Sequence, residues 1–264
     1  MGLAGWLQHP LTRGLDLDDP RTTELRRRVL AGKPFLRRIY EEWYAGLAAE
    51  LPPGAGAVLE LGSGAGFMAD WIPGLVRSEV FPARNADVLL DGTALPFAAG
   101  SLRAIAMTNV LHHVPRPAAF FTEAGRAVRA GGVVAMVEPW VTPWSAVVYR
   151  RLHHEPFDEA AADWDLPAGG PLSGANGALP WILFVRDRSR FDRALPQWSV
   201  RSIRPLMPLR YLLSGGLSFR LSMPGWTFPA WKLLEKAAGP AMWQLAMFAQ
   251  IVLERRANGP AAPP

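Results

Sequence analysis

Cysteine is absent from the 264 residues of the chain, which excludes a disulfide framework and any metal site built on thiolates. Such a chain suits a reducing compartment, and we expect a cytoplasmic protein. Lysine is scarce, because only Lys33, Lys232 and Lys236 occur and arginine supplies the other basic side chains. The net charge of +5 is a modest excess. It favours anionic substrates or surfaces without requiring nucleic acid, and we expect no nucleic-acid partner.

Apolar runs long enough to cross a bilayer are also missing. A long uncharged stretch, residues 237–253, contains Gly239-Pro240 and falls short of the roughly 20 apolar residues that a spanning helix needs. Residues 1–10 have neither a basic start nor a long apolar core, so we expect no signal peptide. Half of the residues are apolar and 19% are charged, which is typical of a globular domain. The length allows one large α/β domain with a substantial addition.

What the chain does contain is a glycine-rich stretch after a short apolar run. Residues 57–61 form the run and predict a buried strand. Gly62, Gly64 and Gly66 follow at every second position. Glycine lets the backbone turn sharply and approach a ligand closely. We expect a helix to begin within residues 67–72, with its free N–H groups facing the loop. The stretch therefore predicts a cofactor-binding strand–loop–helix unit.

The glycine spacing separates two classes of cofactor. A dinucleotide-binding loop follows the pattern Gly-x-Gly-x-x-Gly. Here the third glycine, Gly66, comes one position early and Phe67 follows it. Residues 60–66, Glu-Leu-Gly-Ser-Gly-Ala-Gly, instead resemble motif I of the class I S-adenosylmethionine-dependent methyltransferases. In that family the loop wraps the methionine part of the cofactor.

Three later segments resemble the same family. Glu79 closes the second predicted strand, where an acidic residue is placed to accept hydrogen bonds from a ribose diol. Residues 91–97, Asp-Gly-Thr-Ala-Leu-Pro-Phe, are similar to the family's Asp-Ala-x-x-Leu-Pro-Phe motif, whose aspartate and following N–H meet the adenine. Residues 109–114, Asn-Val-Leu-His-His-Val, look like the segment after strand four in the small-molecule group called type 11. Residues 127–132 resemble that group's Gly-Gly turn, which we expect to end a helix.

The resemblance implies S-adenosyl-L-methionine as the cofactor and a small-molecule acceptor. The candidate cofactor-binding residues are Glu60, Gly62, Ser63, Gly64, Gly66, Phe67, Glu79, Asp91, Gly92, Asn109 and Leu111. Residues 81–86 depart from the family, because they are too few for the helix that most members carry there. The adenine pocket is then either more open or closed by another segment.

Alternating strands and connectors predict the fold. We expect a Rossmann-like, doubly wound α/β domain with a mostly parallel seven-stranded sheet, an antiparallel last strand, N-terminal helices and a substrate-side insertion. The expected strands are residues 57–61, 75–80, 87–90, 103–108, 133–138, 200–203 and 245–253. Ligands of such sheets bind at the carboxyl ends of the strands.

Histidine is the leading candidate for acid–base work, which is needed only if the acceptor arrives protonated. The catalytic candidates are His112, His113, His153 and His154. As an alternative to catalysis, His112 or His113 packs under the loop and hydrogen-bonds a backbone carbonyl. Glu138 is predicted either to bind the acceptor or to orient a histidine. We expect no metal, because the neighbours His153, His154 and Glu155 point different ways and the sequence offers no third, distant ligand.

We divide the chain into an N-terminal helical cap (1–56), a cofactor-binding core (57–138) and an acceptor-side part of the same domain (139–264). Within the last part, residues 140–195 are rich in turns and predict a binding loop or lid. Residues 217–231 carry Trp and Phe among few charges, which favours a large or partly apolar acceptor (a quinone, lipid, sugar or secondary metabolite) and, as a hypothesis, peripheral membrane contact. The alternative function is a non-catalytic cofactor binder or partner subunit with the same fold.

Overall fold

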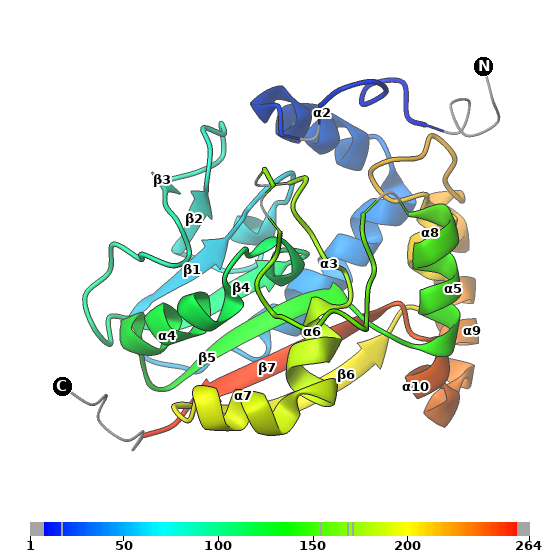
Figure 1. Cartoon of the computed structure of the whole chain (residues 1–264). Coiled ribbons are helices and arrows are strands. Elements are labelled where there is room, and N and C mark those ends of the chain that lie inside the picture. The colour runs from blue at the N-terminus through cyan, green and yellow to red at the C-terminus, as the bar shows by residue number, and fades with distance from the viewer. Residues whose placement is uncertain (1–7, 17, 154, 168, 171, 258–264) are drawn as a thin grey trace.

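The computed structural model describes residues 8–16, 18–153, 155–167, 169–170 and 172–257, and a seven-stranded sheet runs through its centre (Figure 1). The strand order is β3-β2-β1-β4-β5-β7-β6. β1 to β5 pair in parallel, and β7 is antiparallel to both of its neighbours, which confirms the predicted fold class. The strands are β1 (Ala57–Leu61), β2 (Leu75–Glu79), β3 (Val88–Leu89), β4 (Leu102–Thr108), β5 (Val128–Pro139), β6 (Trp198–Leu206) and β7 (Phe248–Arg255).

The core forms two layers, because successive side chains of a strand point to opposite faces of the sheet. Leu59, Ile105 and Met107 face one layer, whereas Ala104 and Ala106 face the other. Helices cover the first layer on the near side in Figure 1, and another helix covers the second layer from behind. The near side carries α4 (Pro117–Ala127), α6 (Leu179–Trp181), the π-helical turn η3 (Ile182–Arg186) and α7 (Arg188–Ala194), and the far side carries α3 (Pro34–Ala48).

The N-terminal helices belong to this core. α2 (Pro20–Ala31) begins after Asp19, whose carboxylate accepts the N–H of Arg21 at 2.9 Å and so caps the helix. α3 presents an apolar stripe to the sheet, and small residues on the facing strands let it approach closely. The stripe consists of Leu36, Ile39, Tyr40, Trp43, Tyr44 and Leu47, all of them buried.

The prediction of a helix after the glycine-rich loop is wrong. Within residues 67–72 the structure holds only a short 3-10 turn, η1 (Met68–Asp70). Residues 62–74 have to leave β1 and return to the start of β2, and Pro73 followed by Gly74, with a φ of +72°, ends the turn at once. Too little chain remains for helical turns, so the loop lacks the helix N-terminus that its resemblance implies.

The Gly-Gly turn also differs from its prediction. α4 ends at Ala127, and Gly131 and Gly132 lie inside β5 instead of at a helix end. The pairing of β4 with β5 shifts register there. A Cβ on Gly132 would meet the Arg103 carbonyl at 2.7 Å, so this glycine permits the close approach of the two strands.

The acceptor-side part of the chain contains more helix than its turn-rich composition indicates. α5 (Pro143–Leu152) starts at Thr142, whose side chain and that of Ser145 form a reciprocal capping pair. Between β6 and β7 lie α8 (Arg210–Ser214), η4 (Gly225–Thr227), α9 (Phe228–Ala237), η5 (Gly239–Ala241) and α10 (Met242–Leu245). In the part of the chain that the structure describes, every helix is too short or too polar to span a bilayer.

Candidate active site

A cavity of about 570 Å³ opens at the carboxyl ends of β1, β4 and β5. Its volume lies in the range of about 300–1,000 Å³ that is typical of small-molecule sites. Most of the predicted site residues line it, namely Glu60, Gly62, Ser63, Gly64, Gly66, Glu79, Asp91, Gly92, Asn109, His112, His113 and His153. The structure thus brings the candidate cofactor residues and the candidate catalytic residues to one cavity.

Two predicted residues, Phe67 and Leu111, are placed differently. The Phe67 ring packs against Tyr44 and under the Arg37 guanidinium, at 4.1 Å, beside a smaller neighbouring cavity. Leu111 is fully buried in the core beneath the main cavity. His154 lies outside the described residues.

The glycine loop is held in shape by its neighbours. Gly62 has a φ of +65°, which suits glycine, and a Cβ there would press on Val110 at 2.8 Å. A Cβ on Gly66 would overlap the hydroxyl of Tyr44, which reaches in from α3. Gly64 donates its N–H to the carboxylate of Glu79 at the end of β2. The loop is therefore fixed sterically on one side and by a charge-assisted hydrogen bond on the other.

Two carboxylates form an acidic wall behind the loop. Burial, and then repulsion from Glu79, raise the pKa of Glu60 to about 8. Burial also raises the pKa of Glu79, although hydrogen bonds from the N–H groups of Gly64 and Val80 offset part of that rise. A cationic ligand in the cavity would favour the ionised form of both carboxylates, because opposite charge nearby lowers a carboxyl pKa.

The adjacent strand ends contribute polar groups. Asp91, after β3, accepts the N–H and the hydroxyl of Thr93, both at 2.8 Å, which orients its carboxylate at the cavity rim. Asn109, after β4, has a φ of +56°, a conformation that asparagine tolerates better than most residues. Its N–H donates to the carbonyl of Val137 at 2.9 Å, which ties this turn to β5.

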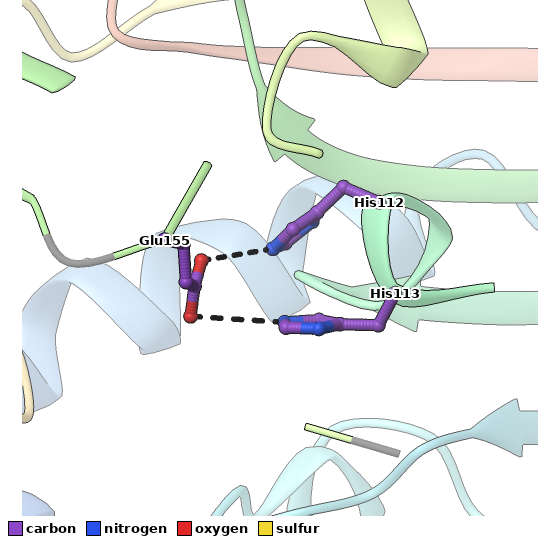
Figure 2. Close-up of side chains that lie close together, drawn as sticks. All are labelled: His112, His113 and Glu155. Atoms are coloured by element: carbon purple, nitrogen blue, oxygen red, sulfur yellow. Dashed lines mark ion pairs between the residues drawn. The ribbon is translucent and has the colours of Figure 1, made fainter. Parts of the chain in front are cut away.

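His112, His113 and Glu155, called the histidine cluster below, lie on the opposite wall (Figure 2). The two imidazoles come from the 3-10 turn η2 (Leu111–His113), and Glu155 comes from the segment after α5. His112 Nε2 lies 3.4 Å from one carboxylate oxygen of Glu155, and His113 Nε2 lies 3.8 Å from the other. The ring centroids of the two histidines are 4.2 Å apart.

Glu138, at the end of β5, orients the histidine cluster from below. One of its oxygens accepts the N–H groups of Val110 and Leu111, both at 2.8 Å. The other lies 2.7 Å from His112 Nδ1. Of the alternatives that the sequence left open, the geometry favours orientation of a histidine, because Glu138 is fully buried beneath His112.

Charge is unevenly distributed over the histidine cluster. Burial alone would lower the pKa of His112, but hydrogen bonds to Glu138 and Glu155 outweigh burial and raise this pKa to about 9. Burial and the nearby charge of His112 lower the pKa of His113 to about 4. Burial opposes ionisation of Glu155, yet the hydrogen bond from His112 keeps the Glu155 pKa below its usual range.

The segment after α5 carries Glu155, and Pro156, Phe157, Leu172 and Gly177 line the cavity with it. The N–H of Asn176 donates to the His112 carbonyl at 2.9 Å, and its side chain bonds the backbone of Asp158 in both directions. Asp18, ahead of α2, accepts the N–H groups of Leu172 and Ser173. This segment is therefore fastened both to the turn that carries the histidines and to the stretch ahead of α2.

Sequence reasoning missed the aromatic side of the cavity. Tyr44 from α3, Tyr149 from α5 and Tyr211 from α8 all line it, together with Phe157. Their helical spacing indicates burial but does not say what they are buried against. Arg26 of α2 also lines the cavity.

Comparison with known proteins finds a methyltransferase family model and methyltransferase relatives. Residues 59–136 match the type 11 family model, described as a methyltransferase domain. An uncharacterized methyltransferase of Mycobacterium sp. (strain JLS) is 33% identical over 127 residues, which cover 42% of this chain and 50% of that protein. An uncharacterized methyltransferase of Mycobacterium tuberculosis (strain ATCC 25177 / H37Ra) is 28% identical over 223 residues, 68% of this chain and 88% of that protein. The chain thus spans about half the length of the first curated relatives that it matches.

Solved structures support the fold. A chain from the complex of the Haloferax volcanii Trm112 methyltransferase activator with a methyltransferase has a TM-score of 0.54 and 14% identity, with 93% of this chain and 100% of that chain covered. A geranyl diphosphate methyltransferase in complex with SAM has a TM-score of 0.51 and 14% identity, with 96% and 100% covered. At this identity the likeness concerns the fold alone.

Proposed function

Because the chain belongs to the type 11 group of the class I S-adenosylmethionine-dependent methyltransferases, we propose that it transfers the methyl group of S-adenosyl-L-methionine to a small-molecule acceptor that is large or partly apolar. One observation carries the proposal: the glycine loop, Glu79 and Asp91 share a single cavity with the histidine cluster. A methyl donor and an acceptor can therefore meet in it.

The residues of the cavity fit this cofactor. S-adenosylmethionine carries a sulfonium and an ammonium group. These cations would favour the ionised forms of Glu60 and Glu79, whose carboxylates then supply the opposite charge. A Cβ on Gly64 would come no closer than 3.9 Å to other groups, so the loop leaves room for a ligand at its tip. Ser63 and the loop would hold the methionine part, Glu79 the ribose, and Asp91 with Gly92 the adenine. The Ser63 hydroxyl and N–H both donate to the Ser78 carbonyl, at 3.2 and 2.9 Å, so Ser63 ties the loop to β2.

The bound cofactor supplies an electrophilic methyl carbon, and the chain has to orient the acceptor and exclude water. The aromatic side chains of Tyr149, Phe157 and Tyr211 give the cavity an apolar wall on the acceptor side. Where the acceptor is a hydroxyl or an acidic carbon, its proton would be taken at the histidine cluster. His153 sits at the edge of this region, where its Nδ1 accepts the N–H of Glu155 at 3.3 Å.

Calorimetry followed by a transfer assay tests the proposal against the alternative of a non-catalytic partner subunit. We expect the chain to bind S-adenosylmethionine and its demethylated product, and Asp91→Ala to weaken both. Transfer of a labelled methyl group to a component of a metabolite extract would then identify the acceptor. Cofactor binding without transfer to any acceptor would support the non-catalytic cofactor binder. Absence of cofactor binding would overturn the methyltransferase and leave a partner subunit that has lost the cofactor.

We also propose that exposed apolar side chains of the segment between β6 and β7 contact anionic membranes. Trp226, Leu233 and Trp243 are 81%, 70% and 57% exposed, and they lie on η4, α9 and α10. Lys236 is exposed on the same helix as Leu233, so apolar and basic groups occur together, as on helices that lie in a membrane interface.

Sedimentation with vesicles tests this surface. We expect the chain to sediment with phosphatidylserine-containing vesicles at low salt and Trp226→Ala to reduce the bound fraction several-fold. Trp71→Ala is the matched control, because Trp71 is also exposed, at 40%, but follows η1 on another part of the molecule. Equal sedimentation of both variants, or none of the wild type, would contradict the contact.

A further inference from the structure

The histidine cluster has the composition and the spacing of a metal site. One donor atom from each of His112, His113 and Glu155 can be chosen so that all lie within 4.8 Å of one another. His112 is buried, the other two are nearly so, and all three line the main cavity. Figure 2 shows both imidazoles pointing at the carboxylate from the same side.

The hydrogen bonds behind the imidazoles fix which nitrogen faces the carboxylate with a lone pair. His113 Nδ1 lies 3.0 Å from the carbonyl oxygen of Gly174, and a carbonyl only accepts, so this nitrogen carries the proton. His112 Nδ1 lies 2.7 Å from the Glu138 carboxylate, which likewise calls for a proton on Nδ1. His113, which is neutral, then directs its Nε2 lone pair toward Glu155, and His112 offers the same lone pair once metal binding releases its Nε2 proton.

This arrangement calls for a cation between the groups. The Glu155 carboxylate lies beside both Nε2 atoms, so a cation held among the three groups is attracted by the carboxylate and can accept both nitrogen lone pairs. A proton on His112 Nε2 would satisfy its contact with Glu155 at 3.4 Å. It would leave the His113 lone pair facing a carboxylate oxygen at 3.8 Å. An ion that binds all three groups resolves both contacts at once.

We propose that His112 Nε2, His113 Nε2 and Glu155 bind a divalent transition-metal ion of the zinc class, with at least one coordination position open to the cavity. Zinc lies about 2.0–2.2 Å from imidazole nitrogen and carboxylate oxygen, so neighbouring ligand atoms of a tetrahedral site are roughly 3.3–3.5 Å apart. The separations of 3.4 and 3.8 Å need only a small contraction. Two imidazoles with one carboxylate select transition metals over magnesium or calcium.

The surroundings of the cluster match those of ligated histidines. Such histidines usually donate their other ring N–H to a carboxylate or a backbone carbonyl, which fixes the tautomer and the ring. Here the Glu138 carboxylate faces His112 Nδ1, and the Gly174 carbonyl faces His113 Nδ1. The residues just before Gly174 are held in turn by Asp18, whose carboxylate accepts the N–H groups of Leu172 and Ser173.

The sequence does not predict this site, because Glu155 is far along the chain from His112 and His113 and only the fold brings the three together. Successive residues of a strand or helix diverge, but His112 and His113 lie on a 3-10 turn with their rings in contact at 4.2 Å.

The role of the ion rests on the proposed function, although its binding does not. An open position toward the cavity would take an oxygen of the acceptor, such as that of an alcohol, a phenol or an enol, and so fix the oxygen relative to the methyl donor. Metal coordination also makes a bound hydroxyl more acidic. The histidines would then hold the ion, and the ion would replace imidazole in activating the acceptor.

Cobalt(II) titration of the chelator-treated chain tests the site, because four- or five-coordinate cobalt has visible absorption bands that the hexa-aqua ion shows only weakly. We expect saturation at one ion per chain, displacement of cobalt by zinc, and no displacement by equimolar magnesium. His113→Asn and Glu155→Gln should each weaken cobalt binding at least tenfold. His9→Asn is the matched control, since His9 lies away from the cavity lining, and it should bind as the wild type does.

A second measurement covers variants that fold poorly: zinc should raise the thermal midpoint of the wild type and of His9→Asn but not of Glu155→Gln. Absence of saturable cobalt binding to the wild type, or equal binding by all variants, would overturn the inference. Calorimetry with S-adenosylmethionine on the same samples separates the two proposals. Cofactor binding without metal binding leaves the proposed function and removes the metal, and the reverse result removes the function and keeps the metal.

Discussion

A buried carboxylate that caps a helical turn and pairs with a basic side chain of that turn occurs at two places in this molecule, once at the cavity and once away from it. At the cavity, Glu138 accepts the N–H groups of Val110 and Leu111 at the start of η2 and pairs with His112. Away from it, Glu235 of α9 accepts the two N–H groups at the start of α8 and pairs with the side chain of Arg210. In each case a buried carboxylate caps a helical turn and holds a side chain on that turn.

The parallel extends to a second carboxylate. Glu155 lies beyond His112, and Glu42 lies beyond Arg210, at 2.8 Å from its guanidinium. The difference is the basic group, because guanidinium stays charged whereas imidazole titrates and can also bind a metal. The pair at Arg210 serves to dock α8 and α9 on α3, and only the pair at His112 faces a ligand.

Removing the buried carboxylate should have the largest effect at both places. Breaking a buried pair costs about 3–5 kcal/mol, since an uncompensated charge remains. We expect Glu138→Ala and Glu235→Ala to lower the free energy of unfolding by similar amounts in urea titrations. Methyl transfer, measured below the unfolding transition, should fall at least tenfold only in Glu138→Ala. A comparable loss of transfer in Glu235→Ala would show that the two carboxylates do not differ in function.

The second-largest effect is expected in the pH dependence of the unfolding free energy, which should distinguish the pair at His112 from the pair at Arg210. The pKa of His112 is raised from 6.5 to about 9 in the folded chain. Its stabilising contribution is therefore fully present below pH 6.5 and is lost as the pH rises through 9. With chelator present, the difference in unfolding free energy between wild type and His112→Asn should shrink by about 2–3 kcal/mol over this range.

Arg210→Gln provides the matched comparison for that measurement. Its difference from the wild type should stay constant between pH 6.5 and 9, because a guanidinium does not titrate there. A constant difference for His112→Asn as well would mean that the imidazole is not held in its charged form.

The glycine loop extends the comparison to a part of the site that is fixed by shape. Gly66→Ala should reduce affinity for S-adenosylmethionine, because the new methyl group overlaps the Tyr44 hydroxyl. Overpacking of this kind costs about 1–3 kcal/mol. Adding Tyr44→Phe removes the overlapping oxygen and should restore part of the affinity measured by calorimetry. No rescue in the double variant would place the cause elsewhere in the loop.

The smallest effect is expected at the exposed rim. Asp91→Asn keeps the shape of the side chain and its turn with Thr93 but removes the charge. We expect about a tenfold loss of cofactor affinity, since a hydrogen bond to a charged group contributes about 1.5–3 kcal/mol and part of it remains. Asp70→Asn, in η1 outside the main cavity, is the control and should leave the affinity unchanged.

The parts of the fold and site that could be predicted are those encoded by short stretches of chain. The strand ends, the glycine loop, Glu79 and Asp91 were located because each follows a run of apolar residues and their order along the chain sets the parallel sheet. The missing helix after the loop could not be found in the same way. Its absence depends on the distance that residues 62–74 must cover back to β2, and apolar content does not report that distance.

The sequence by itself determined the parallel sheet, the position of the cofactor loop and the buried stripe of α3, because periodicity and turn residues act over a few neighbouring positions. Only the tertiary structure decided that Glu155 meets His112 and His113, that Glu138 holds His112, and that Tyr44 closes on Gly66. Those contacts join segments that are far apart in the chain. Packing of α3 and of residues 155–178 onto the sheet creates them, and no local pattern specifies which side chains then face each other.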